Sequence, residues 1–148
     1  MKRFYFFLLA TLLMLPAIAQ EGLCINSFFG KHYIEWKKTT EVQVKGKELK
    51  PYNLTLFRSI TLKDSPEEAL RMEECVLKDA EKSVDKEEGR IGEHLYYGFY
   101  CLPPRYELLY RYIFYRNTSV KSDARRDEVT LVYMEGYATL EELKQMFK

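Results

Sequence analysis

The sequence predicts an α+β fold, in which a mainly antiparallel sheet of about five strands is covered by a long central helix, with short helices near both ends. Three features predict this arrangement. Several short segments alternate apolar and polar residues, as half-buried strands do. A proline-containing start signal opens a long helical segment. One stretch of unusual aromatic content is typical of a β-hairpin. The expected order of elements is α-β-β-α-β-β-β-α.

The first residues have the three parts of a secretory signal peptide. Lys2 and Arg3 form a basic start, and the apolar run Phe4–Leu15 follows. That run is shorter than the roughly 20 residues that a transmembrane helix needs. An Ala-Ile-Ala motif then predicts cleavage between Ala19 and Gln20.

We therefore divide the chain into a signal peptide, residues 1–19, and a single α+β domain, residues 20–148. The mature domain is expected to be exported, either periplasmic or secreted, without stable membrane insertion after cleavage. A lipoprotein is disfavoured because bacterial lipidation needs a small residue immediately before the cysteine, and Leu23 precedes Cys24.

The composition argues against nucleic acid or an anionic membrane surface as partner. The chain has 148 residues, of which 47% are hydrophobic and 30% are charged, as in ordinary globular domains. The signal peptide holds two of the 23 basic residues and none of the 22 acidic ones, so the mature domain is almost neutral. A near-neutral domain without a basic run offers no electrostatic attraction for polyanions.

The first half of the mature domain is predicted to contain a helix and two strands. An i, i+3, i+4 apolar stripe predicts a short helix over Cys24–Tyr33. Alternation predicts strands over Thr39–Lys45 and Leu54–Lys63. Arg58 interrupts the apolar face of the second strand, so it either extends its charge to the sheet edge or pairs with a carboxylate.

The long central helix is predicted over Pro66–Glu88. Ser65 is a natural N-cap, and Glu68 follows three residues later to close a capping box. The apolar stripe of this segment is expected to cover the sheet. Its charged residues, Glu73 and Asp79 among them, are expected to form the solvated face.

The stretch His94–Tyr115 organises the mature domain, because nine of its 22 residues are aromatic. Aromatic side chains suit a pleated, half-buried surface. Pro103 and Pro104 lack the N–H that a central strand needs, so they predict a turn. The expected hairpin strands are His94–Cys101 and Arg105–Tyr115.

Side-chain alternation along this hairpin separates a predicted core face from a candidate functional face. The core face carries Tyr110, Tyr112 and Phe114. On the other face, tyrosines around Gly98 are suited to stack a sugar ring or to receive an apolar side chain of a partner. Ordinary cross-strand pairing of aromatic rings is the alternative. The candidate binding residues are Tyr96, Tyr100, Glu107, Arg111 and Tyr115.

The end of the chain is predicted to hold one more strand and a helix. A polar loop over Arg116–Asp127 leads to an alternating segment, Glu128–Gly136, which predicts the strand. Thr139 and Glu142 then form a second capping box, which opens a short C-terminal helix.

Two motifs carry a resemblance to a known group of proteins. They are FFGKHY, over Phe28–Tyr33, and VTLVYMEGYATLEELKQMF, over Val129–Phe147. Together with the signal peptide and the order of elements, they resemble small exported domains of unknown function from Bacteroidetes. The tyrosine-rich hairpin departs from that pattern. The resemblance implies a fold and an exported location, and it implies no chemistry.

Three cysteines, Cys24, Cys75 and Cys101, remain in the mature domain. Exported proteins hold disulfides, and the odd number leaves at least one thiol free or paired between molecules. A disulfide between Cys75 and Cys101 is one possibility, and three small buried apolar side chains are the alternative. No C-x-x-C motif points to a redox or structural zinc site.

The sequence contains no motif of established chemistry. His32 and His94 are its only histidines, and neither has a second metal ligand at helical spacing, so no metal and no cofactor are predicted. Glu107 and Arg111 lie four residues apart on one strand face, where they either orient a ligand or form a salt bridge.

From these features we predict a non-enzymatic binding or interaction module of the cell envelope, whose partner is an unknown envelope protein or ligand. The alternative is a small envelope hydrolase acting on glycan or peptide, with Glu107, Arg111 and His94 near its site. A third hypothesis is a dimerisation module that pairs edge strands or couples through a free cysteine. The sequence leaves the oligomeric state open.

Overall fold

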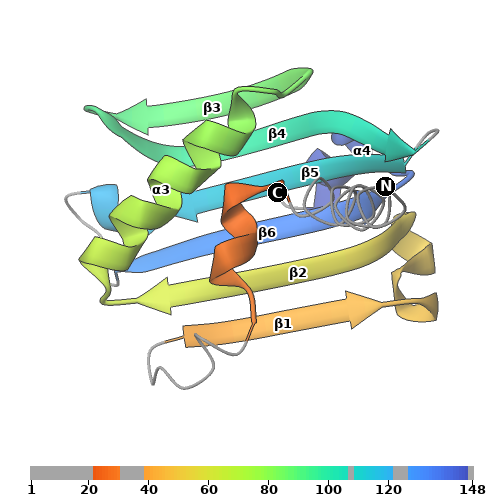
Figure 1. Ribbon diagram of the computed structural model, residues 1–148, viewed down its shortest axis with the longest axis horizontal. Helices are drawn as coiled ribbons and strands as arrows, with labels where there is room; N and C mark the ends of the chain where they lie inside the picture. The colour runs from red at the N-terminus through yellow and green to blue at the C-terminus, as the bar shows by residue number, and fades with distance from the viewer. Residues whose placement is uncertain (1–21, 31–38, 107–108, 122–126, 147–148) are drawn as a thin grey trace, which may run out of the picture.

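The computed structural model describes residues 22–30, 39–106, 109–121 and 127–146, except for the side chains of residues 105 and 106. The predicted signal peptide, His32 and Glu107 lie outside these residues. The described residues form a six-stranded antiparallel sheet with helices packed on both faces (Figure 1). The α+β class with a central covering helix is therefore confirmed, and the sheet has six strands where about five were expected.

The strands lie in the order β1-β2-β6-β5-β4-β3, and the hairpin strands β4 and β5 are both interior. The strands expected over residues 39–45, 54–63 and 128–136 are confirmed at both ends. The bounds are β1 Thr39–Lys45, β2 Leu54–Lys63, β3 Asp85–Ile91, β4 His94–Tyr106, β5 Leu109–Asn117 and β6 Glu128–Gly136.

The first face of the sheet is covered by helix α3, Pro66–Ala80, and by the 3-10 helix η1, Cys24–Phe28 (Figure 1). The backbone is extended at Phe29, so the N-terminal helix is shorter than predicted. Met72 and Val76 of α3 are fully buried against the sheet. The fully buried strand residues beneath them are Ile60, Leu62, Leu95, Tyr100, Leu102, Ile113, Tyr115 and Leu131.

The second face is covered at one end by helix α4, Leu140–Met146, which lies behind the sheet in Figure 1. The predicted capping box of α4 is confirmed. The N–H of Thr139 donates to Glu142 Oε2 at 3.3 Å, and the N–H of Glu142 donates to Thr139 Oγ1 at 3.2 Å. The buried residues of this second core are Leu49, Leu54, Phe99, Cys101, Tyr112, Val132, Met134, Ala138 and Leu143.

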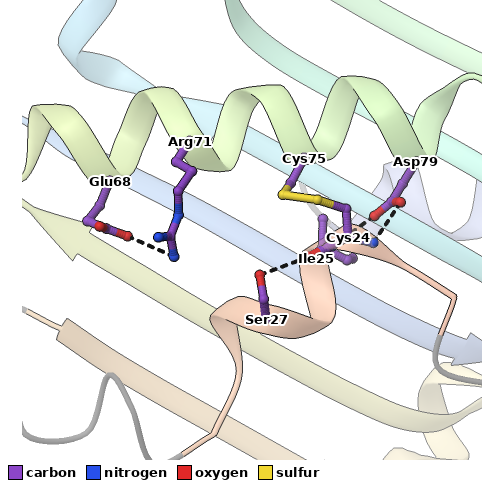
Figure 2. Close-up of a disulfide and its surroundings, with 7 residues drawn as sticks. All are labelled: Cys24, Ile25, Ser27, Glu68, Arg71, Cys75 and Asp79. Carbon is purple, nitrogen blue, oxygen red and sulfur yellow. Dashed lines mark hydrogen bonds and ion pairs between the residues drawn. A yellow bond between two sulfur atoms is a disulfide. The ribbon is translucent and has the colours of Figure 1, made fainter. Parts of the chain in front are cut away.

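A disulfide joins Cys24 of η1 to Cys75 of α3, with their Cα atoms 5.1 Å apart (Figure 2). The pairing of Cys75 with Cys101 is therefore wrong. Cys101 is a buried free thiol, and it lies in the second core whereas Cys75 lies in the first. The two side chains are on opposite faces of the sheet, which prevents a bond between them.

Two carboxylates of α3 that were predicted to be solvated are buried. Asp79 accepts the N–H groups of Cys24 and Ile25 at 2.8 and 2.9 Å, and so caps the first turn of η1 (Figure 2). Glu73 accepts the N–H of Leu95 at 2.5 Å and contacts His94 Nδ1 at 3.2 Å. These contacts compensate for the water that each carboxylate loses on burial.

Helix α3 ends at Ala80, and not at Glu88 as predicted. The N–H and the hydroxyl of Ser83 both donate to the carbonyl of Ala80, which turns the chain into β3. Because β3 is a charged edge strand, its composition resembles that of an exposed helix. At the other end of α3, the side chain of Ser65 does not cap the helix, and its hydroxyl donates to the carbonyl of Lys63.

Arg58 pairs with a carboxylate, which was one of its two expected roles. Its Nη2 lies 3.9 Å from Glu41 Oε1, on the neighbouring strand β1. Its guanidinium carbon also lies 4.5 Å from the centre of the Phe29 ring. The arginine thus connects β1 and β2 to the segment that follows η1.

The hairpin exists, but its turn is not at the prolines. Pro103 and Pro104 lie within β4, where the pairing with β5 shifts register between Leu102 and Tyr106. Such an irregularity accommodates proline because the ladder hydrogen bond is already interrupted there. Arg111 Nε donates to the carbonyl of Pro103 at 3.1 Å and bridges the irregular segment.

The two faces of the hairpin are the reverse of those predicted. Tyr100 and Tyr115 have 0% exposure beneath α3, so these candidate binding residues are core. Tyr112 and Phe114, which were expected beneath the main covering helix, belong to the second face. Since α4 covers only part of that face, Phe114 remains half-buried.

Gly98 makes room for the Tyr100 ring rather than for a ligand. A Cβ on Gly98 would lie 2.6 Å from Cε2 and from the hydroxyl oxygen of Tyr100, which leans across the glycine to donate to Glu88 at 2.9 Å. We expect Gly98→Ala to lower the free energy of unfolding by about 2 kcal/mol through overpacking, as measured by urea denaturation. In a Tyr100→Leu background the cost of Gly98→Ala should largely disappear, and an equal cost in both backgrounds would contradict this explanation.

Candidate functional site

The second face holds a concave site beside α4, which we call the aromatic groove. Its volume is about 330 Å³, at the lower end of the range of small-molecule sites. Strands β3, β4 and β5 and helix α4 all contribute side chains to it. The lining residues are Glu87, Tyr96, Tyr97, Phe99, Phe114, Arg116 and Lys144.

The floor of the aromatic groove is a pair of phenylalanines. Phe99 and Phe114 are cross-strand partners on β4 and β5. Their ring centres are 5.6 Å apart and the ring planes are inclined by 63°, an edge-to-face contact. The next cross-strand pair on the same face is Tyr97 with Arg116, so an aromatic ring and a cation border the floor.

An irregularity in β4 brings two consecutive tyrosines to the groove. Gly89 and Arg90 of β3 pair with Tyr97 and Leu95, which leaves Tyr96 as an extra residue in β4. Consecutive residues of a regular strand point to opposite faces. The extra residue breaks that alternation, so Tyr96 and Tyr97 both line the groove.

A neutralised ion pair forms the α4 side of the groove. Lys144 Nζ lies 2.7 Å from Glu87 Oε2. The hydrogen bond from Lys144, followed by one from the Tyr97 hydroxyl, lowers the pKa of Glu87. The same pair raises the pKa of Lys144. Partial burial, then the bond to Glu87, raises the pKa of Tyr97 to about 12, so this phenol remains a hydrogen-bond donor at neutral pH.

The opposite side of the groove is cationic. The hydroxyl of Tyr96 forms hydrogen bonds with Lys121 and with Arg116, and these bonds lower the pKa of the phenol. Lys121 Nζ also lies 4.5 Å from the centre of the Tyr96 ring. Among the described residues, no carboxylate forms an ion pair with either cation. On the α4 side the cation of Lys144 is therefore fully paired, with Glu87 and also with Glu141 at 3.5 Å, whereas the other side is positive.

The polar surface continues from Arg116 across the sheet. Arg116 pairs with Thr130 of β6, and Thr130 pairs with Thr61 of β2. The two threonine hydroxyl oxygens are 3.3 Å apart. Both threonines are half-buried, and Val42 on the edge strand is 44% exposed. No described helix covers this half of the second face, so the groove opens onto a hydroxyl-bearing surface.

A family model described as "Family of unknown function (DUF6108)" matches residues 12–147. The chain belongs to the DUF6108 family. The expectation of a domain of unknown function is thereby confirmed, whereas the bacterial group and the signal peptide stay predictions. No curated protein and no solved structure matches the chain.

Of the five candidate binding residues predicted for this DUF6108 chain, only Tyr96 lines the groove. Tyr100 and Tyr115 are core residues, and Arg111 binds a backbone carbonyl. Glu107 lies outside the described residues. Most of the lining residues could not be identified from the sequence, because their face of the hairpin was expected to be the helix-covered core, and Glu87 and Lys144 come from elements outside the hairpin. The missed residues are Glu87, Tyr97, Phe99, Phe114, Arg116 and Lys144.

The residues of the predicted hydrolase site are not brought together. Arg111 pairs with Leu102, which is eight residues along β4 from His94. That separation is roughly 26 Å at the usual rise of a strand. His94 instead contacts the buried carboxylate of Glu73 on the opposite, α3-covered side.

Two findings on metal binding and on the membrane apply to the part of the chain that the structure describes. Within it, no cluster of three or more histidine, cysteine or acidic side chains is arranged to hold a metal ion. No described helix has both the length and the apolar character needed to cross a bilayer.

Proposed function

We propose that this DUF6108 protein is an exported, non-enzymatic binding module of the cell envelope and that the aromatic groove is its binding site. The observation that carries the proposal is the groove itself. It has aromatic rings at its floor, of which Phe114 is half-buried, and hydrogen-bonding groups on both sides. A few convergent polar groups around an apolar floor are the usual composition of a ligand site.

The compartment is supported by the disulfide between Cys24 and Cys75. Disulfides persist in oxidising surroundings such as the periplasm or the cell exterior. The same bond occupies the thiol of Cys24, which a lipid anchor would require. Both points agree with export by a cleaved signal peptide.

A hydrolytic function has no comparable support. The proposed catalytic set of Glu107, Arg111 and His94 would need to converge, and the strand register separates Arg111 from His94. The charged pair in the groove, Glu87 with Lys144, is mutually neutralised and adjoins no nucleophile among the lining residues.

The test is to titrate the ¹⁵N-labelled protein with three sets of defined probes and follow its backbone amides by NMR. The sets are neutral disaccharides, uronate-containing disaccharides and acetylated aromatic dipeptides. We expect at least one set to shift the amides of residues 97–99 and 114–116. The double variant Tyr97→Ala/Phe114→Ala should weaken that binding by about tenfold or more, because it removes the aromatic contacts.

The matched control is Tyr52→Ala, which removes an exposed tyrosine. Tyr52 lies on the 3-10 helix η2, Lys47–Tyr52, and none of the groove residues comes from that element. This variant should bind as the parent protein does. Circular dichroism checks that both variants remain folded. The proposal fails if no probe set shifts the groove amides, or if the shifts map to the face beneath α3.

A further inference from the structure

Resting on the proposed function, we infer the chemical class of the ligand: an acidic saccharide, whose ring lies on Phe114 and Tyr97 and whose carboxylate binds Arg116. Three features of the groove point to this class: the distribution of charge, the nature of the floor and the strands from which the groove is built.

The distribution of charge identifies where an anion binds. On the α4 side, Lys144 is 2.7 Å from Glu87 and is already neutralised. On the other side, Arg116 and Lys121 adjoin Tyr96, whose ring Lys121 also contacts, and no described carboxylate forms an ion pair with either cation. A guanidinium held by a neutral phenol keeps its charge uncompensated and presents several N–H donors. A planar carboxylate fits such a fork better than a single point charge does.

The floor identifies what the carboxylate is attached to. Phe99 is almost fully buried, whereas Phe114 and Tyr97 are half-buried and offer ring surface to the groove. A sugar ring has an apolar C–H face and a hydroxyl-bearing edge, so it matches an aromatic floor surrounded by polar groups. The volume of about 330 Å³ limits the part of the ligand held in the groove to one or two rings.

The polar groups around the floor suit hydroxyl substituents. Glu87 supplies acceptor oxygens beside the ring position, and the hydroxyls of Tyr96 and Tyr97 lie on the two sides of the groove. Beyond Arg116, the hydroxyls of Thr130 and Thr61 continue the polar surface over β6 and β2. An oligosaccharide longer than the groove would follow this row of hydroxyls.

The strand arrangement disfavours an extended peptide as the ligand. Peptides that bind to sheets gain affinity through main-chain hydrogen bonds at a free edge. The floor strands β4 and β5 are both interior, and each pairs with a neighbour on either side. Their backbone groups are therefore already bonded, and recognition at the floor depends on side chains alone.

The test compares three acidic probes with their own methyl esters: digalacturonate, a glucuronate-containing disaccharide and sialyllactose. Esterification removes the charge and leaves the ring unchanged. By isothermal titration calorimetry, we expect at least one free acid to bind about tenfold or more tightly than its ester. Arg116→Gln should raise the Kd of the acid by about tenfold and abolish the difference between acid and ester.

The matched control is Lys78→Gln, which removes an exposed cation on α3 and should leave both affinities unchanged. Because Arg116 is exposed, its replacement should not alter the thermal midpoint. The inference is overturned if all three acids bind no better than their esters, or if Arg116→Gln leaves the preference intact. If only aromatic dipeptides shift the groove amides, the saccharide is wrong while the proposed binding function stands.

Discussion

Removing the disulfide by the double substitution Cys24→Ala/Cys75→Ala is expected to lower the free energy of unfolding by about 4 kcal/mol. The two cysteines are separated by 51 residues, and the chain-entropy treatment of a loop of this length gives that value. Most of the loss comes from the unfolded chain, which gains conformational freedom when the cross-link is absent. Urea denaturation monitored by circular dichroism measures the change.

The structure also predicts where the variant is weakened. Helix η1 is attached to α3 by the disulfide and by the Asp79 carboxylate, which accepts the N–H groups of Cys24 and Ile25 (Figure 2). Without the disulfide, only the carboxylate and the packing of apolar side chains hold η1 in place. Asp79→Asn should therefore increase proteolysis within residues 22–30 more strongly in the double variant than in the parent protein.

Cys101→Ala supplies the matched control, since Cys101 is the free thiol of the described residues. Dithiothreitol should destabilise both the parent and the Cys101→Ala protein by the same amount and leave the double variant unaffected. Mass spectrometry confirms that the disulfide has been reduced. If the reduced parent protein then has the same free energy of unfolding as the oxidised one, the disulfide does not stabilise the fold.

The elements that depend on local patterns follow from the sequence. The alternation in β1, β2 and β6 is regular, and their bounds are predicted correctly. Pro66 at the start of α3 and the capping box of α4 are also local signals, and both hold in the structure. Each of these features is determined by residues within a few positions of one another, so a pattern in the sequence is sufficient.

The features that were predicted wrongly depend on partners distant in the sequence. The segment around Glu87 has the composition of a solvated helix, and only pairing with β4 makes it a strand. Asp79 resembles an exposed helix carboxylate until η1 supplies two N–H donors, 55 and 54 residues away. No pattern within the helix itself indicates that this carboxylate is buried.

The candidate site was mislocated chiefly because both faces of the hairpin carry aromatic residues, so the sequence does not indicate which face the main helix covers. Tyr100 and Tyr115 share a face, as alternation predicts, but that face lies beneath α3. An irregularity in β4 adds a second, smaller effect, because an extra residue reverses the alternation before it. The extra Tyr96 in β4 places Leu95 and Tyr100 on the same face. They are five residues apart, and in a regular strand an odd separation would place them on opposite faces. A glycine opposite two consecutive tyrosines, as Gly89 is here, is the signal in the sequence that favours such an irregularity.

At alkaline pH, the free energy of unfolding of this protein is expected to decrease more steeply than its net charge alone suggests. Tyr100, Tyr112 and Tyr115 are almost fully buried, and burial is the main cause that raises the pKa of each well above its ordinary value. In the unfolded chain a tyrosine ionises near pH 10. Above that pH the unfolded state releases protons that the native state retains, so the free energy of unfolding decreases as the pH rises.

The slope should be about 1.4 kcal/mol per pH unit for each buried tyrosine, or about 4 kcal/mol for the three together. Below pH 10 the three phenols are protonated in both states, and this dependence disappears. Urea denaturation at a series of pH values from 9 to about 11.5 measures the slope, while tyrosinate absorbance reports ionisation. Tyr115→Phe should reduce the slope by about one third, whereas Tyr52→Phe, which alters an exposed ring, should not change it. Equal slopes in all three proteins would mean that the ring of Tyr115 is accessible to solvent, and the packing of the hairpin beneath α3 would then need to be revised.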